Sequence, residues 1–438
     1  MSEKQDRPTR HLPVHPDLDQ LKHQAKDLLR AIRRGEPDAI EEFIRFHPNG
    51  ELLIRGLVKL SDAQLALARS YQAASWPRLV HACRLIDAIW RDDLETVRDL
   101  VSKHPHLLHE HALVRSNSNW GPPLTYAANL GRDRIIKMLY ELGATDLETA
   151  IERAALQSKI GTARMLHEMG ALERFGGEPP EDALEGPAYT LSASGTALIF
   201  ELGRRAVDES SKRLAPVHVV LESDSRNPIA KHEILQMYAS HGLELPDTPT
   251  MALHRGRLDL LEQHLHRDPK LLERTFTHEE IYPPEFGCHD EVLATQGTTL
   301  TGTTLLHLCA DYDELEIAKW LIARGMDPNA KATVDRDGFG GHTALFNTVV
   351  SQPNYWMNRQ DQPQTAPFTQ LLLDHRADPN VRASLRKQLH PGYAGRYDVK
   401  TRYEYRDVTP LSWGRRFHAK DFVSELALKL IEEHGGRE

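Results

Sequence analysis

Histidine and cysteine side chains near the middle of the chain are the residues whose types could bind a metal ion. His278 precedes the pair Cys288 and His289, and His342 could join them only through the fold. Zinc sites use four nitrogen or sulfur ligands, commonly in closely spaced pairs, whereas this group has one cysteine and no CxxC or HxxxH spacing. The sequence therefore favours structural roles for these side chains and predicts neither a metal nor another cofactor.

Paired carboxylates such as Asp311 and Asp313 are the candidates for acid and base chemistry. Catalysis would also need a nucleophile or base held in a shielded pocket. The chain lacks a G-x-S-x-G, an HExxH and a kinase motif set. We therefore expect these carboxylates to be solvated at a turn between two helices, and we predict that the protein is not an enzyme.

The glycine-rich stretch DRDGFGGH, residues 335–342, could be taken for a phosphate-binding loop. It lacks the GxxxxGK[ST] pattern, and no strand precedes it. Glycine suits the positive φ of tight hairpin turns, so the stretch predicts the tip of a β-hairpin. The sequence leaves open whether this tip is a plain turn or is shaped to hold the backbone of a partner.

The elements that would position these groups are pairs of short helices, and residues 302–331 show this most clearly. Thr304 can cap a first helix, and a second helix follows that ends at Gly325. The second helix has apolar side chains at helical spacing, so that one stripe is buried: Leu315, Ile317, Ala318, Leu321 and Ile322. Asp327, Pro328 and Asn329 then provide turn chemistry.

This succession of TxLHxxA, a helix and GxDPNA closely resembles the ankyrin repeat. The resemblance covers about residues 85–436 and is strongest over 302–331. It implies an all-α solenoid of about eight or nine helix–turn–helix units. In the ankyrin family the histidine of the TPLH motif ties neighbouring loops together by hydrogen bonds, and the resemblance implies that role for His218 and His307.

Shifts in pattern along the chain predict the domain boundaries. A helical stretch containing SDAQxxxAxxYxxxSWPxL resembles the N-terminal part of certain bacterial ankyrin-repeat proteins of undefined role, and it could shield the apolar end of a solenoid. The predicted segments are a disordered tail at 1–16, an N-terminal helical cap at 17–84, degenerate ankyrin repeats at 85–272, an insertion at 273–301, and C-terminal repeats at 302–436 with insertions at 349–368 and 385–407.

The three insertions emerge from consecutive units, and insertions in neighbouring repeats lie side by side. They carry aromatic and arginine side chains, which dominate the hot spots of interfaces. The predicted partner-binding residues are Tyr282, Phe286, Phe339, His342, Tyr355, Trp356, Arg396, Tyr403 and Tyr405. The competing interpretation is that these side chains pack on one another as a lid over the last repeats, and both can hold.

The composition limits the partner and the compartment. The 438 residues include 54 Lys and Arg against 63 Asp and Glu, a net charge of −9 that disfavours nucleic acid. Three scattered cysteines make no disulfide framework and favour a reducing cytoplasm. The N-terminus lacks the apolar core of a signal peptide, and no apolar run reaches the roughly 18 residues of a membrane span.

Together these patterns predict a non-catalytic ankyrin-repeat scaffold that binds another protein through its concave surface and its aromatic insertions. The alternative is a small-molecule or metal-binding module, perhaps an enzyme, formed by the C-terminal insertions. That alternative requires His278, Cys288, His289 and His342 to converge on a pocket. A weaker idea is that the basic, tyrosine-rich residues 385–406 stack on single-stranded nucleic acid.

Overall fold

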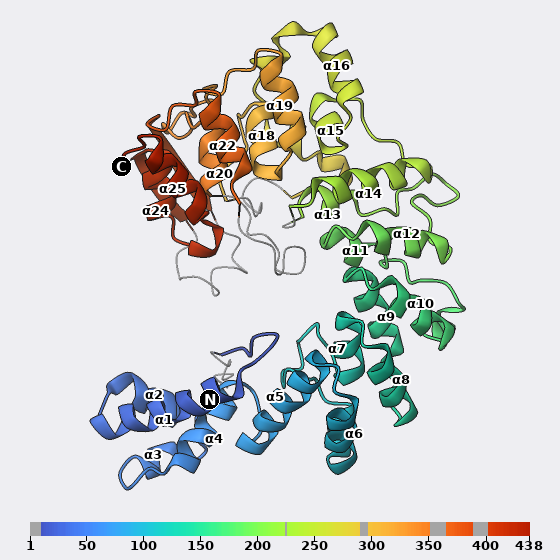
Figure 1. Cartoon of the computed structure of the whole chain (residues 1–438), viewed down its shortest axis with the longest axis vertical. Coiled ribbons are helices and arrows are strands. Elements are labelled where there is room, and N and C mark those ends of the chain that lie inside the picture. Colours follow the sequence, from blue (N-terminus) through green and yellow to red (C-terminus); the bar gives the residue numbers. More distant parts are fainter. Residues whose placement is uncertain (1–9, 224–225, 290–296, 351–364, 389–401) are drawn as a thin grey trace, which may run out of the picture. The chain divides into compact units, whose positions relative to one another are not determined.

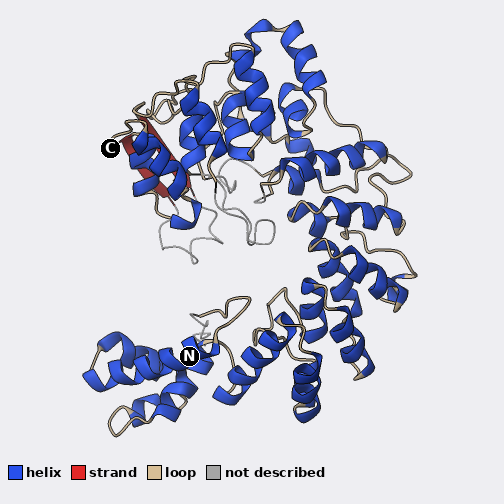
Figure 2. Cartoon of the chain, viewed as in Figure 1, coloured by secondary structure: helices blue, strands red, loops and turns tan. Residues whose placement is uncertain are grey.

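The computed structural model describes residues 10–223, 226–289, 297–350, 365–388 and 402–438 (Figure 1). The chain divides into two compact units, Met1–Glu178 (unit 1) and Pro179–Glu438 (unit 2). Both are built almost entirely of short helices, and the strands of the described residues lie near the C-terminus (Figure 2). The prediction of an all-α repeat fold is confirmed.

Unit 1 begins with a small helical bundle. Its helices are α1 (Leu18–Arg34), α2 (Pro37–Phe46), α3 (Gly50–Leu53) and α4 (Leu60–Ser70). The Asp17 carboxylate caps α1 by accepting hydrogen bonds from the backbone N–H groups of Asp19 and Gln20. Apolar residues of α1 and α2, among them Ile32 and Phe43, form a buried cluster with residues of α4.

Three helix pairs complete unit 1. They are α5 (Trp76–Trp90) with α6 (Leu94–Lys103), α7 (Pro123–Leu130) with α8 (Asp133–Glu141), and α9 (Leu147–Leu156) with α10 (Ile160–Glu168). The Ser75 hydroxyl caps α5 by accepting a hydrogen bond from the backbone N–H of Arg78. Because α5 contacts α7, α7 contacts α9, and α6 contacts α8, each pair stacks on the next.

Unit 2 continues the same construction. Its first three pairs are α11 (Glu185–Tyr189) with α12 (Ala193–Glu201), α13 (Val217–Leu221) with α14 (Pro228–Ser240), and α15 (Pro249–His254) with α16 (Leu258–Arg267). The short helix α17 (His278–Ile281) then packs on α15. The Thr250 hydroxyl donates a hydrogen bond to the Glu280 carbonyl of α17, which ties this segment into the array.

The last pairs of unit 2 are α18 (Leu305–Tyr312) with α19 (Leu315–Ala323), α20 (Ala344–Val349) with α22 (Pro367–Asp374), and α24 (Pro410–Arg416) with α25 (Glu425–Glu433). Helix α18 contacts α20, and α20 contacts α24. Gly414 permits this close packing, because a Cβ there would lie 2.4 Å from Val349 Cγ1. The N-terminal helices of the pairs thus form one layer and the C-terminal helices another.

A β-hairpin joins α22 to α24, and the sequence did not predict it. Strand β1 (Ala383–Gln388) pairs antiparallel with β2 (Arg402–Val408), with Leu385 opposite Tyr405. The register shifts between Ala383 and Leu385, and Asp407 has a positive φ of 50°. The described residues of the predicted insertion at 385–407, which are 385–388 and 402–407, lie in these strands.

Residues 10–16 belong to the segment predicted as a disordered tail, yet they pack on unit 1. Leu12 is 4% exposed, and the Tyr126 hydroxyl of α7 donates a hydrogen bond to the Val14 carbonyl. Burial of Leu12 and contacts with Trp90 of α5 and Tyr126 of α7 hold the segment in place. The polar, proline-bearing sequence of the segment did not suggest these contacts.

Candidate interaction surface

The loops between helix pairs in unit 2 are joined edge to edge by backbone hydrogen bonds. Phe276 N–H donates to the Thr303 carbonyl over 2.9 Å, and Gly302 N–H donates to the Phe276 carbonyl over 2.8 Å. Thr333 N–H donates to the Gly302 carbonyl over 2.8 Å. Gly340 N–H donates to the Ser384 carbonyl over 2.7 Å. Each tip is therefore held by its neighbours.

The glycine-rich stretch forms the tip at residues 335–341, as the sequence predicts. Asp335 Oδ1 accepts hydrogen bonds from the backbone N–H groups of Asp337 and Phe339, both over 2.9 Å. Gly338, Gly340 and Gly341 all have positive φ, which is costly for a residue with a Cβ. The carboxylate of Asp335 and the glycines together fix the shape of this tip.

Two arginines of the β-hairpin hold Phe339 at this tip. The guanidinium carbon of Arg386 lies 5.1 Å from the centre of the Phe339 ring, and that of Arg406 lies 4.3 Å from it. Arg386 also pairs with Asp335 over 2.7 Å and with Asp337 over 3.0 Å. Cation–π contacts and ion pairs therefore join the tip to the hairpin.

The two faces of the β2 strand differ in their surroundings. On one face the Tyr405 ring packs edge-on to Trp413 of α24, and Tyr403 stacks on His418 with ring centres 3.8 Å apart. On the other face Arg402 and Arg406 are more than half exposed. Alternation along a strand places these residues on opposite faces. The hairpin thus packs on α24 through its aromatic face, while its charged face contacts Phe339 of the tip and is otherwise partly exposed.

Two buried histidines connect successive loops below this surface. His307 Nδ1 lies 2.9 Å from the Thr304 hydroxyl, and His307 Nε2 lies 3.0 Å from the His342 carbonyl. His342 Nε2 in turn lies 3.0 Å from the Thr299 carbonyl. Burial lowers the pKa of His307 to about 4 and that of His342 to about 3. Both rings are therefore neutral and serve as hydrogen-bonding ties between loops.

The same stretch is matched by a family comparison. Residues 301–333 match the ankyrin repeat family, and they include His307 with its tie to the next loop. The chain therefore contains an ankyrin repeat. The role that the resemblance implies for the histidine of the TPLH motif is confirmed for His307. His218 differs, because its buried Nδ1 has no hydrogen-bond partner in the part of the chain that the structure describes.

Comparison with solved structures adds little to this assignment. One similar structure is the human ASB11 ankyrin repeat domain, with 14% identity and a TM-score of 0.24 over 72% of this chain and 99% of that one. At that TM-score the likeness carries no argument about arrangement or function. No curated protein matches the chain. Within the described residues, every helix is too short or too polar to cross a membrane.

The predicted partner-binding residues fall into three groups. Five are buried, each less than 7% exposed: Tyr282, Phe286, Phe339, His342 and Tyr405. Tyr403 is half-buried on β2. Tyr355, Trp356 and Arg396 lie outside the described residues. The five buried side chains pack inside unit 2, and their contact with a partner stays a prediction.

Tyr282 shows how the described part of the 273–301 insertion is joined to neighbouring helices. Its hydroxyl is hydrogen-bonded to that of Tyr312 at the end of α18, and the Tyr312 hydroxyl donates to the Leu221 carbonyl of α13 over 2.8 Å. Phe286 faces Arg213, whose guanidinium carbon is 5.4 Å from the ring centre. The insertion thus connects α13, α15 and α18.

The prediction that Asp311 is solvated is wrong, because Asp311 belongs to a group of buried charges beside Tyr312. Arg226 pairs with Asp311 over 2.9 Å, and their side chains are 4% and 0% exposed. Asp311 Oδ1 has no hydrogen-bond partner among the described residues. Burial raises the pKa of Asp311, and Arg226 opposes that shift. Asp311 lies in α18, the first helix of its pair, and its side chain meets Arg226 of a preceding repeat. The local sequence around Asp311 did not reveal this contact.

Lys231 of α14 is a second buried cation in this region. Its Nζ lies 3.5 Å from Glu314 Oε1 and 3.9 Å from the centre of the Tyr312 ring. Burial lowers its pKa to about 8, and Glu314 opposes the shift. Lys231 shares the buried stripe of α14 with Ile234, Leu235 and Tyr238. The position of this lysine within the apolar stripe of α14 was a signal in the sequence that Lys231 is buried.

The metal-binding alternative required four side chains to converge on a pocket, and the structure engages three of them, the histidines, in separate hydrogen bonds. His278 Nε2 lies 2.9 Å from the His289 carbonyl, while His289 Nδ1 lies 2.9 Å from Glu222. His342 is engaged with Thr299 in the loops beside α18. Over the described residues no three His, Cys, Asp or Glu side chains are arranged to hold a metal ion.

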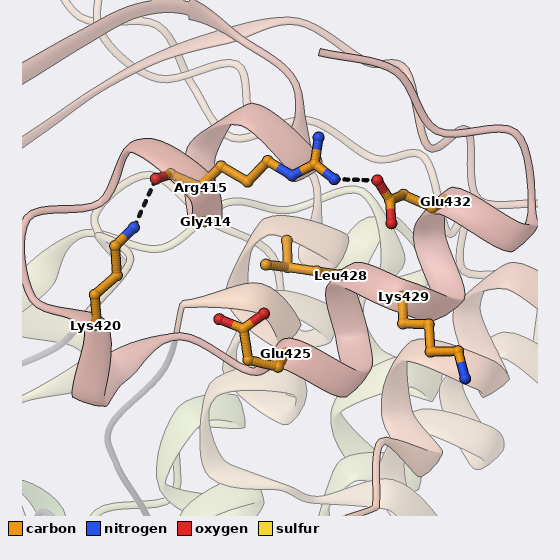
Figure 3. Close-up of a pocket in the computed structure, with 7 residues that line it drawn as sticks. All are labelled: Gly414, Arg415, Lys420, Glu425, Leu428, Lys429 and Glu432. Atoms are coloured by element: carbon orange, nitrogen blue, oxygen red, sulfur yellow. Dashed lines mark hydrogen bonds and ion pairs between the residues drawn. The ribbon is translucent and has the colours of Figure 1, made fainter.

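Two hollows of unit 2 are lined by charged side chains that largely pair with one another. One, of about 380 Å³, lies between α24 and α25, where Arg415 pairs with Glu432 and Lys420 donates to the Arg415 carbonyl (Figure 3). The other, of about 520 Å³, lies beside α16 and α17. There Asp247 pairs with Arg267 over 3.2 Å.

Proposed function

We propose that the protein is a non-catalytic scaffold that binds another protein, and that unit 2 contributes a surface formed by the 335–341 tip and the charged face of β2. Ankyrin repeats generally mediate protein interactions, commonly through first helices and loop tips. The observation that carries the proposal is the asymmetry of β2. Tyr405 is anchored to α24, while Arg402 and Arg406 are more than half exposed on the opposite face, where both pair with Glu404.

Rigidity supports this role. The tip is bonded to β1 through Gly340 and Ser384, and Arg386 bridges the tip carboxylates. A surface that is already ordered loses little conformational entropy when a partner docks. Arginine is also enriched among residues that dominate binding energy. Arg402 and Arg406 are therefore the side chains on which we expect binding to depend.

Several groups that catalysis would use serve the fold in this chain. His307 ties two loops, and Asp311 pairs with Arg226. Burial raises the pKa of the Cys309 thiol well above its usual value, which keeps the thiol protonated and unreactive. These assignments support a non-catalytic role, and three unpaired cysteines are consistent with the reducing cytoplasm.

Affinity capture from a lysate, with identification by mass spectrometry, tests the proposal. The wild-type chain is compared with the double variant Arg402→Ser and Arg406→Ser. The matched control is Arg205→Ser with Lys429→Ser, which removes two exposed cations of unit 2 away from the hairpin. Proteins retained by the wild type and the control but lost from the hairpin variant support it. Identical captured sets for all three folded chains contradict it.

A further inference from the structure

Residues 10–16, a segment of the chain itself, pack on helices of unit 1. Residues 10–16 precede α1 without forming a helix or strand. They run from the α1–α2 bundle, where Arg10 pairs with Glu42 over 2.8 Å, to α7, where the Tyr126 hydroxyl donates to the Val14 carbonyl over 2.5 Å. The segment therefore contacts both the α1–α2 bundle and α7, with a bend at residues 14 and 15.

The receiving surface is aromatic. The His15 ring stacks on Trp90 at the end of α5, with ring centres 4.8 Å apart and planes 16° apart. Trp90 Nε1–H donates to the Tyr126 hydroxyl over 2.7 Å, which leaves the hydroxyl proton of Tyr126 for the Val14 carbonyl. Trp120 packs against Tyr126 with ring centres 4.9 Å apart. The Val14 carbonyl thus accepts a hydrogen bond from the Tyr126 hydroxyl, whose orientation is set by the hydrogen bond from Trp90.

Charged groups complete the contacts at both ends. His15 Nε2 lies 3.4 Å from Asp87 of α5, and His11 Nδ1 lies 3.0 Å from Arg115. At the start of the segment, Arg10 also lies 3.5 Å from Gln24 of α1. The segment is recognised through a cation, a buried leucine, one carbonyl and one stacked ring.

We propose that this surface of unit 1 is a recognition site for a peptide segment of a partner protein, and that residues 10–16 occupy it as an internal competitor. The partner segment carries a cation, an aliphatic residue two positions later, and a histidine or aromatic ring three positions after that. This is the spacing of Arg10, Leu12 and His15. The proposal concerns unit 1 and is independent of the surface on unit 2.

Tethering sets how strongly the internal segment competes. A short linker gives a tethered ligand an effective concentration of about 1 mM. A peptide with micromolar affinity for the open surface would then need about 1 mM to half-saturate the intact chain. Releasing the internal segment should lower that value toward the intrinsic dissociation constant, without any change to the surface itself.

The test uses the full chain and a fluorescent synthetic peptide, RHLPVHPDL, which copies residues 10–18. Fluorescence anisotropy compares the wild type with a release variant, Leu12→Asp with His15→Ala. We expect the peptide to bind the release variant with at least about a tenfold lower half-saturation concentration than the wild type. A peptide whose second histidine is replaced by alanine should bind the release variant more weakly.

Two further measurements keep the outcome decisive. Asp87→Lys in the release variant should weaken peptide binding, because a lysine cannot accept the hydrogen bond that Asp87 accepts from His15, and it leaves the buried residues of α5 in place. Size-exclusion chromatography reports whether copies exchange their segments. The proposal is overturned if the folded release variant binds the peptide no better than the wild type. It is also overturned if the wild type is a dimer that the release substitutions convert to a monomer.

Discussion

His307 Nε2 lies 3.0 Å from the carbonyl oxygen of His342, so the histidine of one loop is bonded to the backbone of the next. Burial holds the pKa of His307 at about 4 and that of His342 at about 3, against an ordinary value of 6.5. Both side chains must stay neutral for the loops to remain tied. The stability of this part of unit 2 therefore depends on pH.

We predict that the free energy of unfolding falls as the pH drops from 6.5 toward 4. In this window the unfolded chain binds protons that the folded histidines do not, so acid favours unfolding. At about 1.4 kcal/mol per pKa unit, each histidine accounts for roughly 3 kcal/mol by pH 4. Urea unfolding of the wild type and of His307→Gln, followed by circular dichroism, checks this. Equal pH dependence in the two chains would show that His307 does not contribute.

The buried pair of Arg226 and Asp311 gives a second prediction. Removing one partner leaves an uncompensated buried charge, so Arg226→Met should destabilise the chain by about 3–5 kcal/mol. The double variant Arg226→Met with Asp311→Leu removes both charges and should recover most of that loss. A double-mutant cycle in urea measures the coupling. Additive losses from the two single substitutions would contradict the pairing.

Gly340 and Gly338 provide a matched pair of backbone positions at the 335–341 tip. Both have positive φ, at 118° and 82°. A Cβ at Gly340 would lie 2.0 Å from the Thr333 carbonyl oxygen, whereas a Cβ at Gly338 meets nothing within 4 Å. Gly338→Ala should therefore cost only the conformational penalty of about 1–2 kcal/mol, and Gly340→Ala more. Thermal unfolding of both variants checks the order, and equal costs would show that the Thr333 contact adjusts freely.

The fourth prediction concerns how fast the three cysteine thiols react with a labelling reagent. Burial raises the pKa of Cys83 and of Cys288 to about 12, and that of Cys309 well above its usual value. We expect slow labelling of the native chain by a thiol reagent at pH 8, and rapid labelling of three thiols in urea, because the thiolate is the reactive form. Rapid native labelling of Cys309 would contradict its burial.

The sequence predicted elements whose signals are local. Residues 302–331 have apolar spacing, a capping threonine and a terminal glycine, and they form α18 and α19. Glycines at the 335–341 tip likewise indicated its turn. The alternation in RYEYRDV, residues 402–408, was also a local signal for β2, but its tyrosines and arginines were attributed to an irregular insertion.

The candidate site depended on contacts that no local pattern encodes. Tyr282 was predicted to face a partner because aromatic residues in an aperiodic segment suggest an exposed hot spot, yet its hydroxyl meets Tyr312. Asp311 was expected in solvent because it ends a helix, and its partner Arg226 lies 85 residues away in sequence. Residues 10–16 show no helical spacing, so the sequence predicted no packing for them, yet Leu12 is buried.

Hydrogen exchange measured by mass spectrometry tests the proposed scaffold function most directly, with the chain alone compared with the chain bound to its captured partner. The account predicts new protection in the peptides that contain the 335–341 tip and residues 402–408 of β2, and its loss when Arg402 and Arg406 are replaced by serine. A partner that binds with full affinity and leaves exchange in both peptides unchanged would contradict the account.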